Sequence, residues 1–146
     1  MLRATLAPAL AALLLAAAPQ QDRWNRDARD RVQLAASQDG REGVRLERLA
    51  VSGVMGEEGL RTVPVWLEAG RTYLFVGVCD DDCTDLDVRV FDTLGRAVAS
   101  DEDPRPTPMV DFTPRRSGEH AVRASMVGCS QPACRYAVAV LVGDAR

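Results

Sequence analysis

Five aspartates close together form the strongest candidate for a binding site in this sequence. Asp80, Asp81 and Asp82 are consecutive, and Asp85 and Asp87 follow shortly after them. Calcium takes roughly six to eight oxygen ligands in proteins, and a loop dense in carboxylates supplies several of them. The five residues therefore predict a calcium site. The alternative is that Asp85 accepts backbone hydrogen bonds in a turn while Asp80 to Asp82 are solvated.

Four cysteines form two closely spaced pairs, Cys79 with Cys83 and Cys129 with Cys134. Four cysteines allow three connectivities. The short separations favour the pairing of 79 with 83 and of 129 with 134, because both members of each pair lie within easy reach. Bridges that join one loop to the other are the alternative, and four thiolates around zinc are another.

Catalytic motifs are scarce in this chain. His120 is the only histidine, and no nucleophile elbow, zinc-binding helix motif or phosphate-binding glycine loop accompanies it. A catalytic histidine needs a positioned nucleophile or carboxylate, so we expect His120 to be a hydrogen-bonded residue at the start of a strand. The run from Asp101 to Asp103 is expected to be a solvated loop. With 5% aromatic residues, we expect Trp24 and Trp66 to serve in packing.

Charge and length limit the classes of protein to which this chain can belong. The 146 residues suit one domain. All 18 basic residues are arginines, and the 21 acidic residues outnumber them, so the net charge is −3. This balance argues against a nucleic-acid partner. The neighbouring Arg115 and Arg116 could form an exposed contact with a partner, but two charges do not make a basic patch.

The first 18 residues predict a signal peptide. Arg3 precedes an apolar stretch from Ala4 to Ala18, which ends in small residues. A membrane anchor is the alternative, but a span needs about 20 apolar residues, and Pro8 interrupts this stretch. The protein is therefore predicted to be secreted or periplasmic, with no membrane span after cleavage, and its cysteines are expected to be oxidised.

Residues 19–43 are predicted to be a polar leader that is either a short helix or disordered. Asp22 with Arg26 and Asp27 with Arg31 have helical spacing. Trp24, Ala28 and Val32 would share one helix face, a stripe that we expect to dock only loosely.

Residues 44–146 predict an antiparallel β-sandwich or jelly roll, since apolar and polar residues alternate between turns and no second helix is indicated. Two segments, Tyr73 to Val78 and Tyr136 to Val142, are apolar on both sides and are expected to be central strands covered on both faces. A bulge near Glu47 or Arg48 would repair a change of phase, and Pro64 is expected on an edge strand. The alternating apolar positions are Val63, Val65 and Leu67; Leu86, Val88 and Val90; and Val122, Ala124 and Met126.

Several short motifs occur in a recognisable order. They are Leu67–Tyr73, Asp85–Val88, Phe91 and Asp92 with Gly95, Phe112–Pro114, Ser117–His120 and Tyr136–Val138. Together they resemble the bacterial pre-peptidase C-terminal domain, a small β-sandwich appended to many secreted proteases and related to collagen-binding modules of clostridial collagenases. The resemblance covers residues 44 to 142. It implies a divergent, free-standing member of that family.

This chain departs from the family at His120, where Tyr or Phe is common, and in its paired cysteine loops. Some relatives bind calcium at one end of the sandwich. Their further ligands, from the segment before the first strand, have no match here.

The predicted function is a secreted, non-catalytic binding or accessory module that contacts an extracellular protein or a polysaccharide. One alternative is a structural protein stabilised by calcium and disulfides. The other is an exported hydrolase, which would need paired carboxylates on either side of a groove.

Overall fold

Eight strands and one helix make up the described part of the chain. The structure is a computed structural model that describes the backbone of residues 9–143 and the side chains from residue 18 onward. The elements are α1 (Ala9–Gln38), β1 (Val44–Met55), β2 (Leu60–Leu67), β3 (Tyr73–Cys79), β4 (Cys83–Phe91), β5 (Ala97–Asp101), β6 (Met109–Phe112), β7 (Gly118–Cys129) and β8 (Cys134–Gly143).

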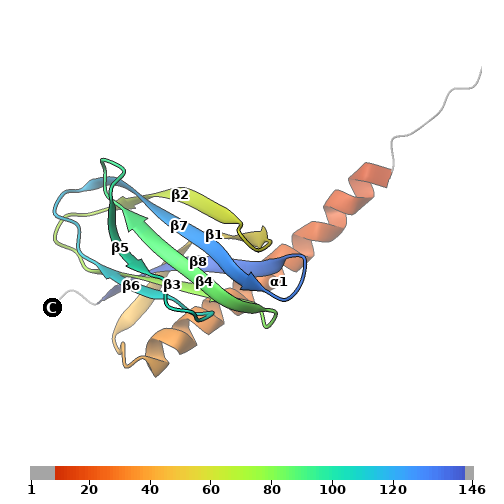
Figure 1. The fold of residues 1–146 in the computed structure, drawn as a ribbon, viewed down its shortest axis with the longest axis horizontal. Helices are drawn as coiled ribbons and strands as arrows, with labels where there is room; N and C mark the ends of the chain where they lie inside the picture. The colour runs from red at the N-terminus through yellow and green to blue at the C-terminus, as the bar shows by residue number, and fades with distance from the viewer. Residues whose placement is uncertain (1–8, 144–146) are drawn as a thin grey trace, which may run out of the picture.

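The strands form two antiparallel sheets that pack face to face (Figure 1). The first sheet has the order β1-β8-β3-β6, and the second has the order β2-β7-β4-β5. The predicted β-sandwich is confirmed. Its core is built from the residues that alternate with polar ones in the sequence, and Leu86, Val88 and Val90 are fully buried.

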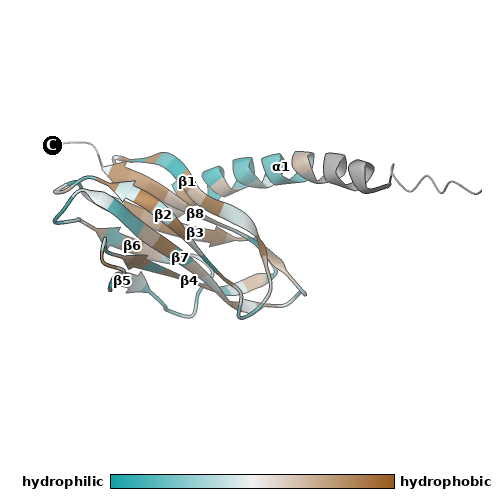
Figure 2. Cartoon of the chain, turned by 90° about the horizontal axis from the view of Figure 1, so that it is seen from above, coloured by the Kyte–Doolittle hydropathy of each residue, from teal (hydrophilic) through white to brown (hydrophobic). Residues whose placement is uncertain are grey.

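The central strands β3 and β8 are covered on both sides, as their unbroken apolar sequences predict. One face of each strand lines the sandwich core, and the other packs under α1. In Figure 2 both strands are among the most hydrophobic parts of the chain. The molecule therefore has three layers, with α1 outside the first sheet and nothing among the described residues outside the second.

Helix α1 docks more closely than its narrow apolar stripe predicts. Trp24 is 5% exposed, and Ala28, Val32 and Ala36 are fully buried. The stripe is longer than predicted, because Ala36 continues it by a further turn, and it packs against apolar residues of β3 and β8. Trp24 Nε1 also donates a hydrogen bond to the Tyr136 carbonyl at 3.0 Å.

The helical alternative for the leader is the one observed, and α1 runs past the end of the sandwich (Figure 1). Among the described residues, no helix combines the length and the apolar character that crossing a bilayer requires. Most of the predicted signal peptide lies outside the residues whose side chains are described, and its cleavage stays a prediction.

The edge strands have irregular features. In β1, register shifts occur at Glu47 and at Ala50. The first is the predicted bulge, and the second has no counterpart in the sequence analysis. Pro64 lies in β2, which is an edge strand as predicted. The edge strands on the other side, β5 and β6, have five and four residues.

Two ends of the sandwich follow from the antiparallel order. The connections β1–β2, β3–β4, β5–β6 and β7–β8 lie at one end, which we call the disulfide end. The connections α1–β1, β2–β3, β4–β5 and β6–β7 lie at the opposite end.

Candidate functional site

Two small disulfide rings lie side by side at the disulfide end. Cys79 is bonded to Cys83 and Cys129 to Cys134, with Cα–Cα distances of 5.9 and 6.0 Å. These are the two pairs that the sequence analysis favours. Cys83 and Cys129 are also register partners across β4 and β7, so the two rings are neighbours.

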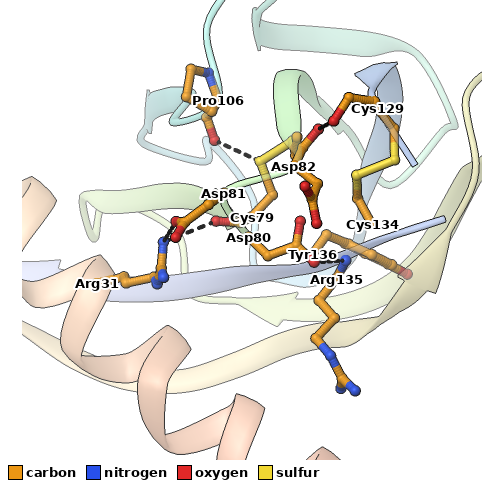
Figure 3. Close-up of a disulfide and its surroundings, with 12 residues drawn as sticks. Arg31, Cys79, Asp80, Asp81, Asp82, Pro106, Cys129, Cys134, Arg135 and Tyr136 are labelled. Carbon is orange, nitrogen blue, oxygen red and sulfur yellow. Dashed lines mark hydrogen bonds and ion pairs between the residues drawn. A yellow bond between two sulfur atoms is a disulfide. The ribbon is translucent and has the colours of Figure 1, made fainter.

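Asp80, Asp81 and Asp82 in the first ring point in different directions (Figure 3). Asp81 Oδ1 accepts a hydrogen bond from Arg31 of α1 at 3.1 Å, and Asp80 Oδ2 accepts one from the Arg135 amide at 2.8 Å. The Asp82 carbonyl accepts hydrogen bonds from the amide and hydroxyl of Ser130. These contacts tie the first ring to α1 and to the second ring. The Asp81 side chain is 91% exposed, so its ion pair contributes little to stability.

Asp85 and Asp87 lie in β4 on the outer face of the second sheet, because they alternate with the buried Leu86 and Val88. One oxygen of each carboxylate is buried and has no hydrogen-bond partner among the described residues. Burial raises the pKa of Asp87, and the negative charges of Asp85 and Glu102 raise it further.

The five predicted calcium ligands therefore do not converge. The Asp81 side chain contacts Arg31 on the α1 side of the sandwich, whereas Asp85 and Asp87 face outward from the other sheet. Among the residues whose side chains are described, no three His, Cys, Asp or Glu side chains are arranged to hold a metal ion. The calcium site has no assembled ligand set here and stays a prediction from the sequence.

Replacing Asp87 with Asn is expected to stabilise the fold slightly at neutral pH. A carboxyl with a raised pKa in the folded state costs stability when it ionises, and that cost disappears as the pH falls through the folded pKa. We expect the melting temperature of Asp87→Asn to exceed the wild-type value by about 1 °C at pH 7, which corresponds to a few tenths of a kcal/mol. The two proteins should melt alike near pH 3, and a variant that melts lower at pH 7 would refute the assignment.

The same variant tests the calcium prediction. If an ion uses Asp87, millimolar calcium raises the melting temperature of the wild type but not that of Asp87→Asn. If calcium and a chelator give the same wild-type melting curve, the calcium prediction is wrong.

The second acidic run departs from its prediction as a solvated loop. Asp101 is only 8% exposed and ends β5. Its Oδ2 accepts hydrogen bonds from the Met109 amide at 2.8 Å and from Arg105, and its Oδ1 accepts one from the Asp103 amide. Glu102 and Asp103 are exposed as predicted. Asp101 is a structural residue that fixes the β5–β6 connection.

His120 is 4% exposed and lies near the start of β7. Its Nδ1 is 3.0 Å from the Gly118 carbonyl, which can only accept, so Nδ1 carries the hydrogen. The ring meets Phe112 edge to face, with centroids 5.6 Å apart. No described carboxylate or hydroxyl forms a hydrogen bond with His120, and these contacts match the predicted structural role.

The outer face of the second sheet, which we call the uncovered face, is the best candidate for a functional surface. Trp66 is 64% exposed and Leu60 is 62% exposed, and both project from the edge strand β2. We expected Trp66 to serve in packing, and that expectation is wrong. The neighbours Val65 and Leu67 point into the core, so the alternation of β2 directs Trp66 outward.

Besides Asp85 and Asp87, the uncovered face carries one apolar row and one basic row. Pro64, Ala121 and Phe91 are register partners across β2, β7 and β4 and form the apolar row. In the next row, Arg123 lies between Thr62 and Arg89. The Arg123 guanidinium lies 4.7 Å from the centre of the Phe91 ring, and Arg123 Nε donates a hydrogen bond to the Thr62 hydroxyl at 2.9 Å. Arg123 is thus held flat against the sheet.

Comparisons with known proteins give a distant likeness of fold. No family model matches the chain, and no curated protein matches its sequence. Among solved structures, the chain is similar to the crystal structure of Aeromonas hydrophila PliG, a periplasmic lysozyme inhibitor of g-type lysozyme. The TM-score is 0.46 and the identity 11%, over 62% of this chain and 81% of that one. A likeness at this level assigns neither a family nor a function, and the resemblance to the pre-peptidase C-terminal domain stays a prediction.

Proposed function

We propose that this protein is an exported, non-catalytic binding module and that its uncovered face contacts another protein outside the cytoplasm. One observation carries the proposal. The outer face of the first sheet is buried under α1, while the outer face of the second carries an exposed tryptophan on β2 and, on β7 and β4, Arg123, Phe91 and Arg89. Trp and Arg are enriched among the residues that dominate the binding energy of protein interfaces.

Export is supported by the predicted signal peptide and by the two disulfides, because bonded cysteines persist in oxidising compartments. The non-catalytic part is supported by the separation of the aspartates and by the contacts of His120. Asp81 lies toward α1 whereas Asp85 and Asp87 face outward from the other sheet, so Asp81 cannot flank one scissile bond with either of them.

Site-specific photo-cross-linking tests the proposal. A benzophenone amino acid at position 66 is expected to cross-link a partner protein when the full chain is expressed in its native host and irradiated. The same group at position 34 is the control, because Leu34 is equally exposed but lies on α1, on the far side of the molecule. A protein captured at 66 and not at 34 supports the proposal, whereas equal capture at both positions contradicts it.

Trp66→Ala is expected to weaken binding to the captured partner about thirtyfold, the factor that corresponds to a loss of about 2 kcal/mol at an interface hot spot. The side chain is exposed, so the free energy of unfolding should change by less than about 0.5 kcal/mol. Titration calorimetry and thermal melting measure the two effects. Leu34→Ala should change neither.

A polysaccharide is the competing partner, since an exposed tryptophan also stacks on sugar rings. Co-sedimentation with insoluble polysaccharides separates the two. Retention that is lost in Trp66→Ala, with no protein captured at position 66, would replace the protein partner with a glycan.

A further inference from the structure

A pocket of about 550 Å³ lies at the opposite end of the sandwich, away from the disulfide rings. Phe112 of the first sheet and the buried His120 of the second line this pocket, together with Val98 of β5, which is 41% exposed. The β4–β5 turn and the β6–β7 connection form its rim. The pocket therefore opens between the two sheets, and its volume is within the usual range for sites that bind small molecules or single side chains.

The β4–β5 turn is held in one shape by Asp92. Its Oδ1 accepts hydrogen bonds from the amides of Leu94 and Arg96, each at 2.9 Å, and its Oδ2 accepts one from Arg96 Nε at 2.8 Å. Gly95 has a φ of +78°, which glycine adopts readily and other residues rarely do. The hydrogen bond from the Arg96 amide, followed by the contacts with the Arg96 side chain, lowers the pKa of Asp92. Asp92 is therefore ionised, and Arg96 balances its charge.

Two further positive charges in the pocket are not paired with a carboxylate among the described residues. Arg115 and Arg116 in the β6–β7 connection are exposed. Neither forms an ion pair or a side-chain hydrogen bond with any residue in the described part of the chain. The pocket thus has an excess of two positive charges, although the whole chain has a net charge of −3.

The pocket also offers apolar surface to a ligand. Phe112 and Val98 offer carbon surface, and Leu94 at the rim is 73% exposed. His120 contributes a ring whose Nε2 makes no hydrogen bond to the described residues, because its contact with Gly118 uses Nδ1. A ligand that complements this arrangement combines one anionic group with a hydrophobic body.

We propose that this pocket binds a carboxylate that is attached to an aromatic or aliphatic group, with Arg115 and Arg116 contacting the carboxylate and Phe112 contacting the hydrophobic body. Guanidinium groups pair with carboxylates through two parallel hydrogen bonds, which gives the contact direction as well as strength. Such a carboxylate belongs either to a free organic acid or to the C-terminal residue of a peptide. This inference goes beyond the proposed function, since it uses none of the residues of the uncovered face.

Titrations followed by amide chemical shifts test the proposal on the full chain. Phenylacetate is the first probe, phenylacetamide is its neutral counterpart, and inorganic phosphate is an anion without a hydrophobic body. We expect phenylacetate to shift the amides of Leu94, Gly95 and Thr113 in a saturable way, and we expect at least tenfold weaker binding of the other two probes. Equal binding of phenylacetate and phenylacetamide, or no saturable shift up to 10 mM, which is about the weakest affinity worth assigning to a site, would overturn the proposal.

The double variant Arg115→Ala/Arg116→Ala should weaken phenylacetate binding at least tenfold. Its matched control is Arg26→Ala/Arg29→Ala, which removes the same charge from exposed positions on α1 that make no described ion pair. Equal weakening in both double variants would show a general effect of net charge and would refute the pocket. Arg115→Gln/Arg116→Gln removes both charges but keeps polar side chains, and it repeats the test if the alanine variant does not fold.

N-acetyl-phenylalanine separates the two sources of the carboxylate. Tighter binding than phenylacetate points to a peptide C-terminus, and weaker binding points to a free acid, and either result supports the pocket. The cross-link at position 66 should be unaffected by Arg115→Ala/Arg116→Ala, so the pocket and the proposed function can fail separately.

Discussion

Trp24→Ala is expected to cost about 4 kcal/mol of unfolding free energy, the range for removing a large buried aromatic side chain. Trp24 is almost fully buried between α1 and the first sheet, and its Nε1 binds the Tyr136 carbonyl. The variant leaves both a cavity and a carbonyl without its donor. For a domain of this size we expect the melting temperature to fall by about 10 °C. Urea titration followed by circular dichroism measures the free energy.

Leu34→Ala is the control for this variant, since Leu34 lies on the same helix but is 57% exposed. It should change the unfolding free energy by less than about 0.5 kcal/mol. Fluorescence gives a second readout, because Trp24 is buried and Trp66 is exposed. The emission of Trp24→Ala should come from a solvated tryptophan alone. If both variants melt alike, α1 is not docked as described.

Asp101→Asn is expected to cost about 3 kcal/mol at pH 7, because it removes the charge from a buried carboxylate that accepts three hydrogen bonds. An asparagine offers one accepting oxygen in place of two. Its NH2 group would face donors in either orientation, because Oδ1 now accepts from the Asp103 amide and Oδ2 accepts from both Arg105 and the Met109 amide. The β5–β6 connection then loses its anchor. Chemical denaturation at pH 7 measures the loss.

The pH dependence of this loss follows from the pKa of Asp101. Burial alone would raise that pKa, but the hydrogen bonds from Met109, Arg105 and Asp103 outweigh it and lower the pKa below the ordinary value. The stabilisation is therefore complete above the unfolded pKa of about 4, and it disappears as the pH falls through the folded pKa. The difference between wild type and Asp101→Asn should shrink below about pH 4.

Asp103→Asn is the matched control. Asp103 is exposed and its side chain makes no hydrogen bond or ion pair with the described residues. A loss of equal size in this variant would mean that local negative charge, and not the burial of Asp101, stabilises the connection.

Much of the fold could be predicted from the sequence because β-structure imposes a period of two. The alternation around Leu86 and Val122 gave the core of the second sheet, and the unbroken apolar runs of β3 and β8 gave the strands covered on both faces. The strands β5 and β6 could not be predicted in the same way. Each is too short for an alternating pattern, and their pairing depends on the neighbouring β4 and β3.

The candidate site could likewise be predicted from the sequence only in part. The outward direction of Trp66, Asp85 and Asp87 follows from the parity of their strands, and this signal was present in the sequence. The position of Asp81 depends on Arg31, which is 50 residues away and belongs to α1. The burial of Asp101 depends on the Met109 amide across a loop. No local pattern encodes such pairs, because the chain must fold before the partners meet.

The irregular edge strands have a consequence for behaviour at high concentration. An open sheet edge presents unpaired N–H and C=O groups that recruit further strands and lead to aggregation. Here the bulges at Glu47 and Ala50 interrupt β1, Pro64 removes a donor from β2, and β5 and β6 are too short to serve as templates. Growth of fibrils by strand addition is thereby discouraged on both sides. Recognition of a partner through side chains is accordingly favoured over extension of a sheet.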